Sequence, residues 1–210
     1  MDIQAFFQLC DGKWISQRTT HQLLEQNNQS GRSDLWGEIL DAGDGDVVAL
    51  CQQLKVDPSV VLCGLRLRWN EVAEAYQSKF KPKNEGVALM VAIAPHQESA
   101  AHQESAAHLE SADHQESVTN PTSNPSSAGQ ILRSLNAAHP GMGTFSIGAD
   151  EALTLRFEEA GAISEERIWF ASPNLRLRSS SIKQDDVVCI TTFCSEIRMV
   201  APAATPVSEI

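Results

Sequence analysis

Basic side chains are scarce in this sequence. Its 210 residues include 16 lysines and arginines against 27 aspartates and glutamates, which gives a net charge of -11. A protein that wraps nucleic acid or sits on an anionic membrane needs a positive field, so both classes are excluded. Long apolar runs are also missing, and the N-terminal stretch MDIQAFFQLCDGKW has no basic segment. We therefore expect neither a membrane span nor a signal peptide, and a location in the cytosol.

Ligand spacings typical of metal sites are absent as well. The five cysteines are an odd number without a CxxC or Cys/His spacing, which in a reducing compartment is typical of small core residues. Four histidines recur in HQESAA-type repeats that begin at residue 96. A step of six residues turns about 600° around a helix, so these imidazoles would not share a helical face. We expect no metal site.

The repeat differs in composition from the rest of the chain. It runs into VTNPTSNPSSAG, which is rich in Pro, Ser and Asn, and such polar low-complexity sequence cannot bury enough apolar surface to fold. We interpret residues 96–126 as a disordered insertion in a loop. The prediction is one domain over residues 1–200, interrupted by this insertion, with residues 201–210 as a flexible tail.

Elsewhere the hydrophobic pattern has a period of two. Short segments such as TLRFE, ERIWFAS and VVCITTF alternate or are rich in β-branched and aromatic residues, and turn-forming residues separate them. Many short strands favour a barrel or a sandwich. We expect helices at Ile3–Leu9 and Asp46–Leu54, and a third, short one around Ala128–Asn136. Gly12-Lys13-Trp14 resembles the G-x-W that opens the first strand of lipocalin-type barrels.

Two arginines stand beside leucines in NLRLRSS. In an unbroken strand over residues 174–183, Leu175 and Leu177 face one way while Arg176 and Arg178 face the other. On pattern alone the arginines lie equally well on a solvated face. Inside a small barrel they would need an anion, because an unpaired buried guanidinium is too costly, and a ligand that carries carboxylates would satisfy both.

Three longer sequence segments indicate a family. The segments FFQLCDGKWISQRTTHQL, SEERIWFASPNLRLRSS and TTFCSEIRM resemble the S-type (CpcS/CpeS) phycobiliprotein lyases of cyanobacteria and cryptophyte plastids. The resemblance implies a ten-stranded antiparallel barrel of lipocalin or fatty-acid-binding type. It also implies an enzyme that captures an open-chain tetrapyrrole (bilin) noncovalently and attaches it through a thioether to a cysteine of a phycobiliprotein subunit.

The resemblance also assigns residues. It implies that Arg18, Arg176 and Arg178 bind the bilin propionates, where planar guanidiniums contact carboxylates bidentately. Glu166 matches the carboxylate that faces the pyrrole nitrogens, and alternation places Glu165 on the opposite face of the strand. A protonated bilin beside Glu166 would be more open to attack by the acceptor thiolate. The other expected ligand-binding residues are His21, Trp69 and Ser180.

The resemblance leaves several properties open. The expected substrate is phycocyanobilin or phycoerythrobilin, without a permanent cofactor, and the acceptor is a subunit of the phycocyanin, allophycocyanin or phycoerythrin type. A homodimer, or a heterodimer with a paralogous lyase subunit, is compatible with it. Two alternatives remain: a non-catalytic carrier of a bilin or another small molecule, and an assembly subunit of a heteromeric lyase. Many relatives carry an aromatic residue in a Met-Glu-Trp context after the Trp69 strand, whereas this sequence has EAYQ with Tyr76. The histidine-glutamate repeat matches no family feature.

Overall fold

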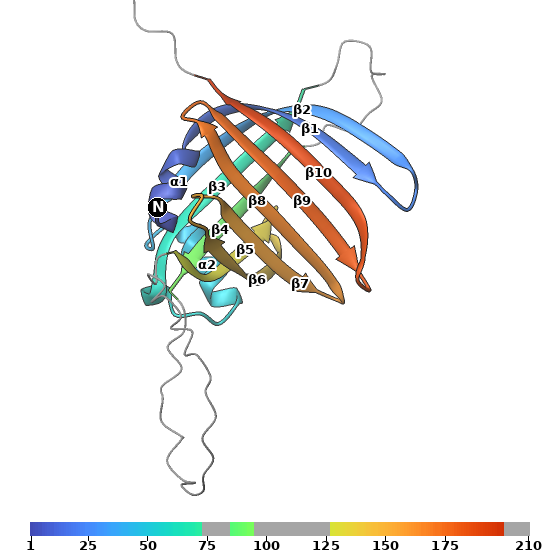
Figure 1. Ribbon diagram of the computed structural model, residues 1–210. Coiled ribbons are helices and arrows are strands. Elements are labelled where there is room, and N and C mark those ends of the chain that lie inside the picture. The colour runs from blue at the N-terminus through green and yellow to red at the C-terminus, as the bar shows by residue number, and fades with distance from the viewer. Residues whose placement is uncertain (73–84, 95–126, 200–210) are drawn as a thin grey trace, which may run out of the picture.

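The computed structural model describes residues 1–72, 85–94 and 127–199, and these form a closed barrel of ten antiparallel strands (Figure 1). This confirms the expected fold class. The strands are β1 (Gly12–Gln22), β2 (Asn27–Leu40), β3 (Val61–Glu71), β4 (Glu85–Ile93), β5 (Ala128–Leu135), β6 (Ala138–Ile147), β7 (Leu153–Glu159), β8 (Ala162–Ser172), β9 (Leu175–Gln184) and β10 (Val187–Arg198). The helices are α1 (Ile3–Cys10), α2 (Gly45–Gln53) and the 3-10 turn η1 (Pro58–Val60).

The barrel closes where its first and last strands meet. β1 pairs with β10 from Trp14 opposite Arg198 to Gln22 opposite Ile190, and every other strand pairs with its neighbours in sequence. Because the strands run up and down in order, alternate connections lie at the same end. The β1–β2, β5–β6, β7–β8 and β9–β10 turns therefore surround one end of the barrel, and α1 lies at the other (Figure 1).

Helix α1 seals its end of the barrel. Asp2 caps the helix by accepting a hydrogen bond from the backbone NH of Ala5, and the helix presents Phe6 and Phe7 to the interior, both fully buried. These rings pack into a core cluster that includes Trp14, whose indole NH donates to the carbonyl of Cys10 at 3.1 Å. The apolar face of α1 thus closes this end of the barrel with hydrophobic side chains.

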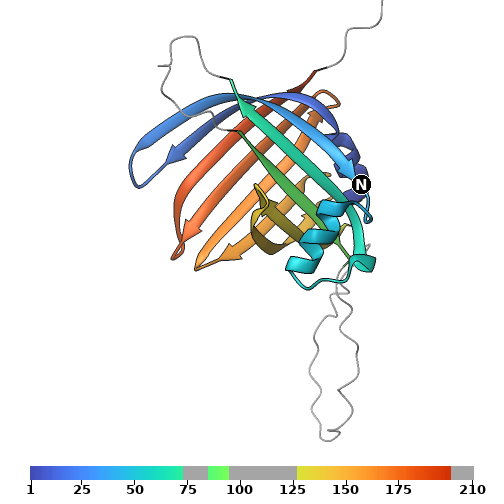
Figure 2. The same ribbon diagram turned by 180° about the vertical axis from the view of Figure 1, so that it is seen from behind.

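The second helix lies outside the barrel. Figure 2 shows α2 against the strands that follow it in sequence, and it buries Val47, Leu50 and Cys51 in a separate cluster with outward-facing residues of β4 and β5. Asp44 caps its first turn by accepting from the backbone NH of Asp46. The helices expected at Ile3–Leu9 and Asp46–Leu54 are therefore confirmed, to within about one residue at each end.

The third expected helix, at Ala128–Asn136, is wrong, because Ala128–Leu135 is strand β5. Ile131 points into the barrel core, whereas its neighbour Leu132 packs in the cluster under α2. A strand that is buried on both faces carries consecutive apolar residues, and such a run does not show the period of two.

Several expectations lie outside the described residues. These are the disordered insertion at 96–126 with its histidines, the tail at 201–210, and Tyr76. The strands that flank the insertion are neighbours, since Ile93 pairs with Gln130 in the β4–β5 ladder. The ends of the two flanking strands therefore lie side by side in the barrel wall. Within the described ranges, no helix is long and apolar enough to cross a membrane.

Candidate functional site

A cavity of about 310 Å³ occupies the barrel interior. Phe6, Phe7 and Leu65 are apolar parts of its wall, and charged side chains stand among them. Its lining comprises Phe6, Phe7, Cys10, Ser16, Arg18, Ser33, Leu35, Leu65, Leu67, Trp69, Ala88, Met90, Arg133, Leu135, Leu153, Glu166, Ile168, Arg176, Arg178, Cys194 and Glu196. The site thus offers apolar walls and a small set of convergent charges, which is the usual composition of a small-molecule site.

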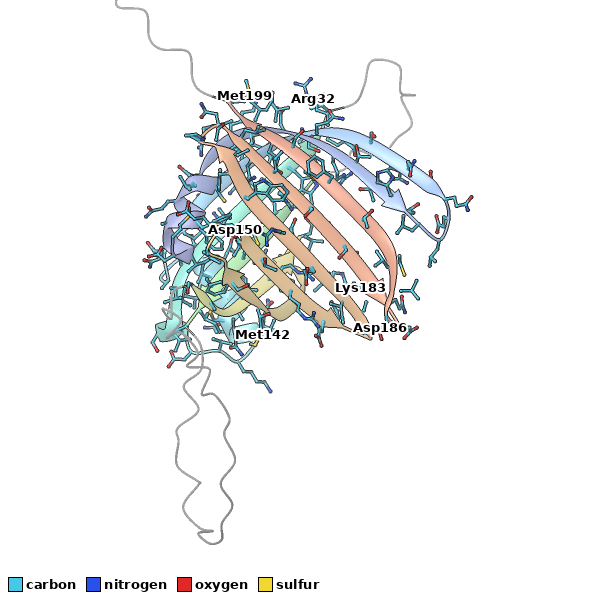
Figure 3. The ribbon with its side chains drawn as sticks, in the orientation of Figure 1. Arg32, Met142, Asp150, Lys183, Asp186 and Met199 are labelled. Atoms are coloured by element: carbon cyan, nitrogen blue, oxygen red, sulfur yellow. The ribbon has the colours of Figure 1, made fainter. Side chains whose placement is uncertain are left out.

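Strand β9 directs both of its arginines into this cavity. Arg176 is only 2% exposed, and its guanidinium lies 4.7 Å from the centre of the Trp14 ring. Arg178, two residues further along the strand, is half-buried and also lines the cavity. Figure 3 shows β9 running toward Lys183 and the turn at Asp186. The alternation expected for residues 174–183 is confirmed, and it places the arginines inside.

Glu196 of β10 is the anion that these arginines meet. It is 1% exposed and accepts hydrogen bonds from Arg176 Nε and, at 3.3 Å, from Arg178 Nη1. The hydroxyl of Ser16 donates to it at 3.4 Å. Burial by itself raises the pKa of Glu196, but the charges of Arg178 and Arg176 outweigh this effect, and the pKa lies below its ordinary value. Glu196 therefore stays ionised inside the barrel.

Glu166 of β8 is the second carboxylate of this network. It accepts hydrogen bonds from Arg178 at Nε, with an N–O distance of 2.9 Å, and at Nη2. Burial by itself lowers the pKa of Arg178, but the charges of Glu166 and Glu196 outweigh this effect. The pKa lies above its ordinary value, so the guanidinium remains charged. The neighbouring Glu165 is exposed on the outer face, as alternation requires.

The protein itself thus supplies carboxylate partners for Arg176 and Arg178. The sequence pattern requires an anion for inward arginines and offers a carboxylate ligand as one candidate, and in the structure Glu166 and Glu196 are such anions. One buried nitrogen, Arg176 Nη2, has no hydrogen-bond partner among the described residues. The Glu166–Arg178–Glu196–Arg176 network is therefore a preformed polar wall beside an apolar cavity.

The other expected site residues divide into two groups. Arg18 of β1 and Trp69 of β3 line the same cavity as the network. His21 is exposed in β1 near the β1–β2 turn, with Nδ1 at 2.8 Å from Asn28 Oδ1. Ser180 pairs with Glu166 across the β8–β9 ladder but lies outside the cavity lining. The structure brings together Arg18, Trp69, Glu166, Arg176 and Arg178.

Neither Cys63 nor Cys194 is an activated nucleophile. Burial raises the pKa of Cys63 to about 12. Cys194, which lines the cavity, also has a raised pKa, because burial outweighs the neighbouring charge of Arg178. A nucleophilic cysteine needs a lowered pKa. These two thiols stay protonated and contribute apolar surface.

The comparison with known families supplies the decisive observation. The model of the family described as CpeS-like protein matches residues 2–104 and 99–199, nearly the whole chain. The chain belongs to the CpeS-like family. This confirms the resemblance drawn from the segments around Arg18, Glu166 and Glu196.

Individual relatives of the CpeS-like family agree with this assignment. A protein of Thermosynechococcus vestitus named chromophore lyase CpcS/CpeS is 38% identical over 201 residues, which cover 95% of this chain and 93% of the relative. A phycocyanobilin lyase subunit CpcS of a Picosynechococcus species is 28% identical over 94% of this chain and 86% of its own. The solved S-type phycobiliprotein lyase CPES of Guillardia theta has a TM-score of 0.69 at 22% identity and covers 96% of this chain and 95% of its own, which shows the shared fold.

Reasoning from the sequence missed two charged residues of the CpeS-like site. Glu196 lies in TTFCSEIRM, where alternation puts it on the same face as Cys194. Arg133 lies in β5, in the segment that the sequence pattern assigned to a helix. Correct strand assignment, with alternation, would have grouped Glu196 with Cys194 and Arg133 with Ile131, but it would not by itself have shown that these faces are the inner ones.

Proposed function

We propose that this member of the CpeS-like family is a chromophore lyase that binds a bilin in its barrel and attaches it to a cysteine of a phycobiliprotein subunit. The observation that carries the proposal is the hydrogen-bonded Glu166–Arg178–Glu196 network beside an apolar cavity. The names of the relatives, chromophore lyase and phycocyanobilin lyase subunit, support it.

The cavity suits the chemistry of a bilin. An open-chain tetrapyrrole has a conjugated surface, two propionates and four pyrrole-type nitrogens. Leucines and Trp69 provide apolar contacts for the conjugated system, and the carboxylate of Glu166 is an acceptor for pyrrole N–H groups. Arg178 holds Glu166 in place through two hydrogen bonds to one of its carboxylate oxygens.

The network would promote addition to the bilin. In the proposed reaction, the partner's thiolate adds to the ethylidene group of ring A. A carbon–sulfur bond forms, the carbon–carbon double bond becomes a single bond, and the proton from the thiol ends on the tetrapyrrole. A negative Glu166 stabilises the protonated, more electrophilic tetrapyrrole. The acceptor cysteine belongs to the partner, so the lyase needs no nucleophile of its own.

The finer assignments follow from the same proposal. We assign phycocyanobilin or phycoerythrobilin as substrate and a phycocyanin-, allophycocyanin- or phycoerythrin-type subunit as acceptor, and these partners place the reaction in the cytosol. Arg18 is the residue we assign to a propionate, with Arg176 and Arg178 on the adjacent wall. A second copy or a paralogous subunit would act as a partner in assembly.

One experiment separates this function from its alternatives. The protein is incubated with phycocyanobilin and an apo-phycobiliprotein, and the partner is examined after denaturation in acid. A lyase gives acid-stable colour on the partner, and this colour disappears when the acceptor cysteine is replaced by serine. A carrier gives colour only on itself in the native state, and an assembly subunit gives neither. Either of the last two results would overturn the proposal.

A further inference from the structure

The charges that line the cavity do not cancel. Four arginines and two glutamates face it, an excess of two positive charges. The two glutamates are both engaged with Arg176 and Arg178, on the β8–β9–β10 wall. The uncompensated charge therefore belongs to the remaining pair, Arg18 of β1 and Arg133 of β5.

Neither of these two arginines is satisfied by its neighbours. Both are half-buried, and within the part of the chain that the structure describes neither guanidinium forms a hydrogen bond or an ion pair. Glu71 and Arg18 both approach Gly31, yet they form no ion pair. A partly desolvated guanidinium without an anion is unfavourable, so the fold keeps two cations that lack a partner.

The contact that Arg133 does make leaves its donors free. Its guanidinium lies over the ring of Phe157 at 4.0 Å from the ring centre. Such a contact uses the face of the guanidinium, whereas its N–H groups project in the plane and remain available to a carboxylate. Phe157 thus holds Arg133 in one place and presents it to the cavity.

The barrel order places the two cations on separate walls. Going round the barrel from β1 to β5, the chain passes β2, β3 and β4, so Arg18 and Arg133 stand on different sides of one cavity. Trp69 of β3 lines the arc between them. An elongated planar ligand that lies against Trp69 can meet one arginine on each side.

Arg18 is already assigned to one carboxylate of the ligand, and we propose that Arg133 binds the second carboxylate of the same dicarboxylate ligand. If the proposed function holds, these are the two propionates of the bilin, and the inference rests on it in that respect. Arg176 and Arg178 then hold Glu196 and Glu166 and do not bind the propionates. The two free cations thus match the two carboxylates in number and in sign.

The test compares a bilin with its ester. Biliverdin and biliverdin dimethyl ester have the same conjugated skeleton, but only the free acid carries carboxylates. Each is titrated into the wild type and into Arg18→Met and Arg133→Met, which keep most of the side-chain volume. We expect each substitution to weaken binding of the free acid by about thirtyfold or more and to leave ester binding nearly unchanged. Arg133→Lys should retain part of the affinity.

A matched control is available on β7. Arg156 is exposed beside Phe157 and pairs with Glu158, so Arg156→Met should change neither titration, and thermal melts establish that all variants fold. Equal losses for acid and ester, or no loss in Arg133→Met, would overturn the inference while the lyase proposal stands. A wild type that binds neither compound would overturn both.

Discussion

The tetrapeptide LRLR occurs twice in this chain, at residues 65–68 in β3 and at residues 175–178 in β9. In β3 the leucines point into the barrel, with Leu65 and Leu67 buried in the main core. In β9 the arginines point inward and the leucines face outward, where Leu177 pairs with Trp169 across the β8–β9 ladder. The same tetrapeptide therefore turns its leucines inward in β3 and its arginines inward in β9.

The two pairs of arginines also meet different surroundings. Arg66 lies outside the barrel with 12% of its side chain exposed, and it reaches Glu38, Asp44 and Asp46, whose side chains are 52%, 29% and 68% exposed, so the carboxylate side of these pairs is open to water. Arg176 is enclosed with Glu196, and both are nearly inaccessible to water. An ion pair in solvent contributes little, whereas one that is shut inside the barrel becomes essential once it exists.

The face is decided by what continues the strand. In β3 the positions that alternate with the arginines extend to Cys63 and Trp69, so one face is apolar from Cys63 to Trp69. In β9 the inner positions continue with Ser180, and the ionic partners come from β8 and β10. Alternation therefore determines which residues share a face, while the neighbouring strands determine whether that face is the inner one.

The largest difference between the two segments should appear in stability. Arg176→Leu leaves Glu196 buried with one of its two cations removed, and we expect a loss of about 3–5 kcal/mol in the free energy of unfolding. The matched change on the outer face, Arg66→Leu, removes a partly solvated contact and should cost about 1 kcal/mol or less. Urea denaturation of both variants measures the two losses. Similar losses would contradict the view that enclosure separates the two segments.

The same one-residue alternation separates two neighbouring glutamates on β8, and here the effect should appear in catalysis. Glu166→Gln keeps the shape but removes the negative charge beside a protonated bilin, so we expect thioether transfer to slow by about a hundredfold and bilin binding to weaken less. Single-turnover transfer and equilibrium titration measure the two quantities.

Glu165→Gln is the control, because Glu165 is exposed on the outer face of β8. It should leave both binding and transfer close to those of the wild type. If the loss of transfer appeared in the Glu165 variant and not in the Glu166 variant, the assignment of the inner residue to catalysis would be wrong.

Local pattern was sufficient for most of the fold. The period of two along β8, β9 and β10 predicts their strands and which residues share a face, whereas the inward position of Glu166, Arg176 and Arg178 was implied by the family resemblance. It failed at Ala128–Leu135, because α2 covers the outer face of that strand and both faces became apolar. The failure followed from a tertiary contact that no local window contains.

The site was less accessible to sequence reasoning. The pair formed by Arg176 and Glu196 joins residues 20 positions apart, and only the register between β9 and β10 brings them together. Arg133 likewise meets Phe157 across the interior, from β5 to β7. Strand faces can be predicted from alternation, but which charges neutralise one another depends on pairings that alternation does not specify.

The smallest expected effect concerns pH and separates Glu196 from the carboxylates around Arg66. The folded-state pKa of Glu196 is lowered, because Arg178 and Arg176 outweigh the effect of burial. The stability that this group contributes is therefore present above its ordinary pKa of 4.5 and is lost as the pH falls through the lower, folded-state pKa. A difference of one unit in pKa between folded and unfolded chain corresponds to about 1.4 kcal/mol.

Unfolding free energies are measured in urea from about pH 6 downward for the wild type, Glu196→Gln and Glu38→Gln. We expect Glu38→Gln to lose stability toward acid as the wild type does, and Glu196→Gln, although less stable throughout, to lose less of it. Parallel pH profiles for all three would mean that the enclosed pair at Arg176 responds to protons no differently from the solvated one at Arg66.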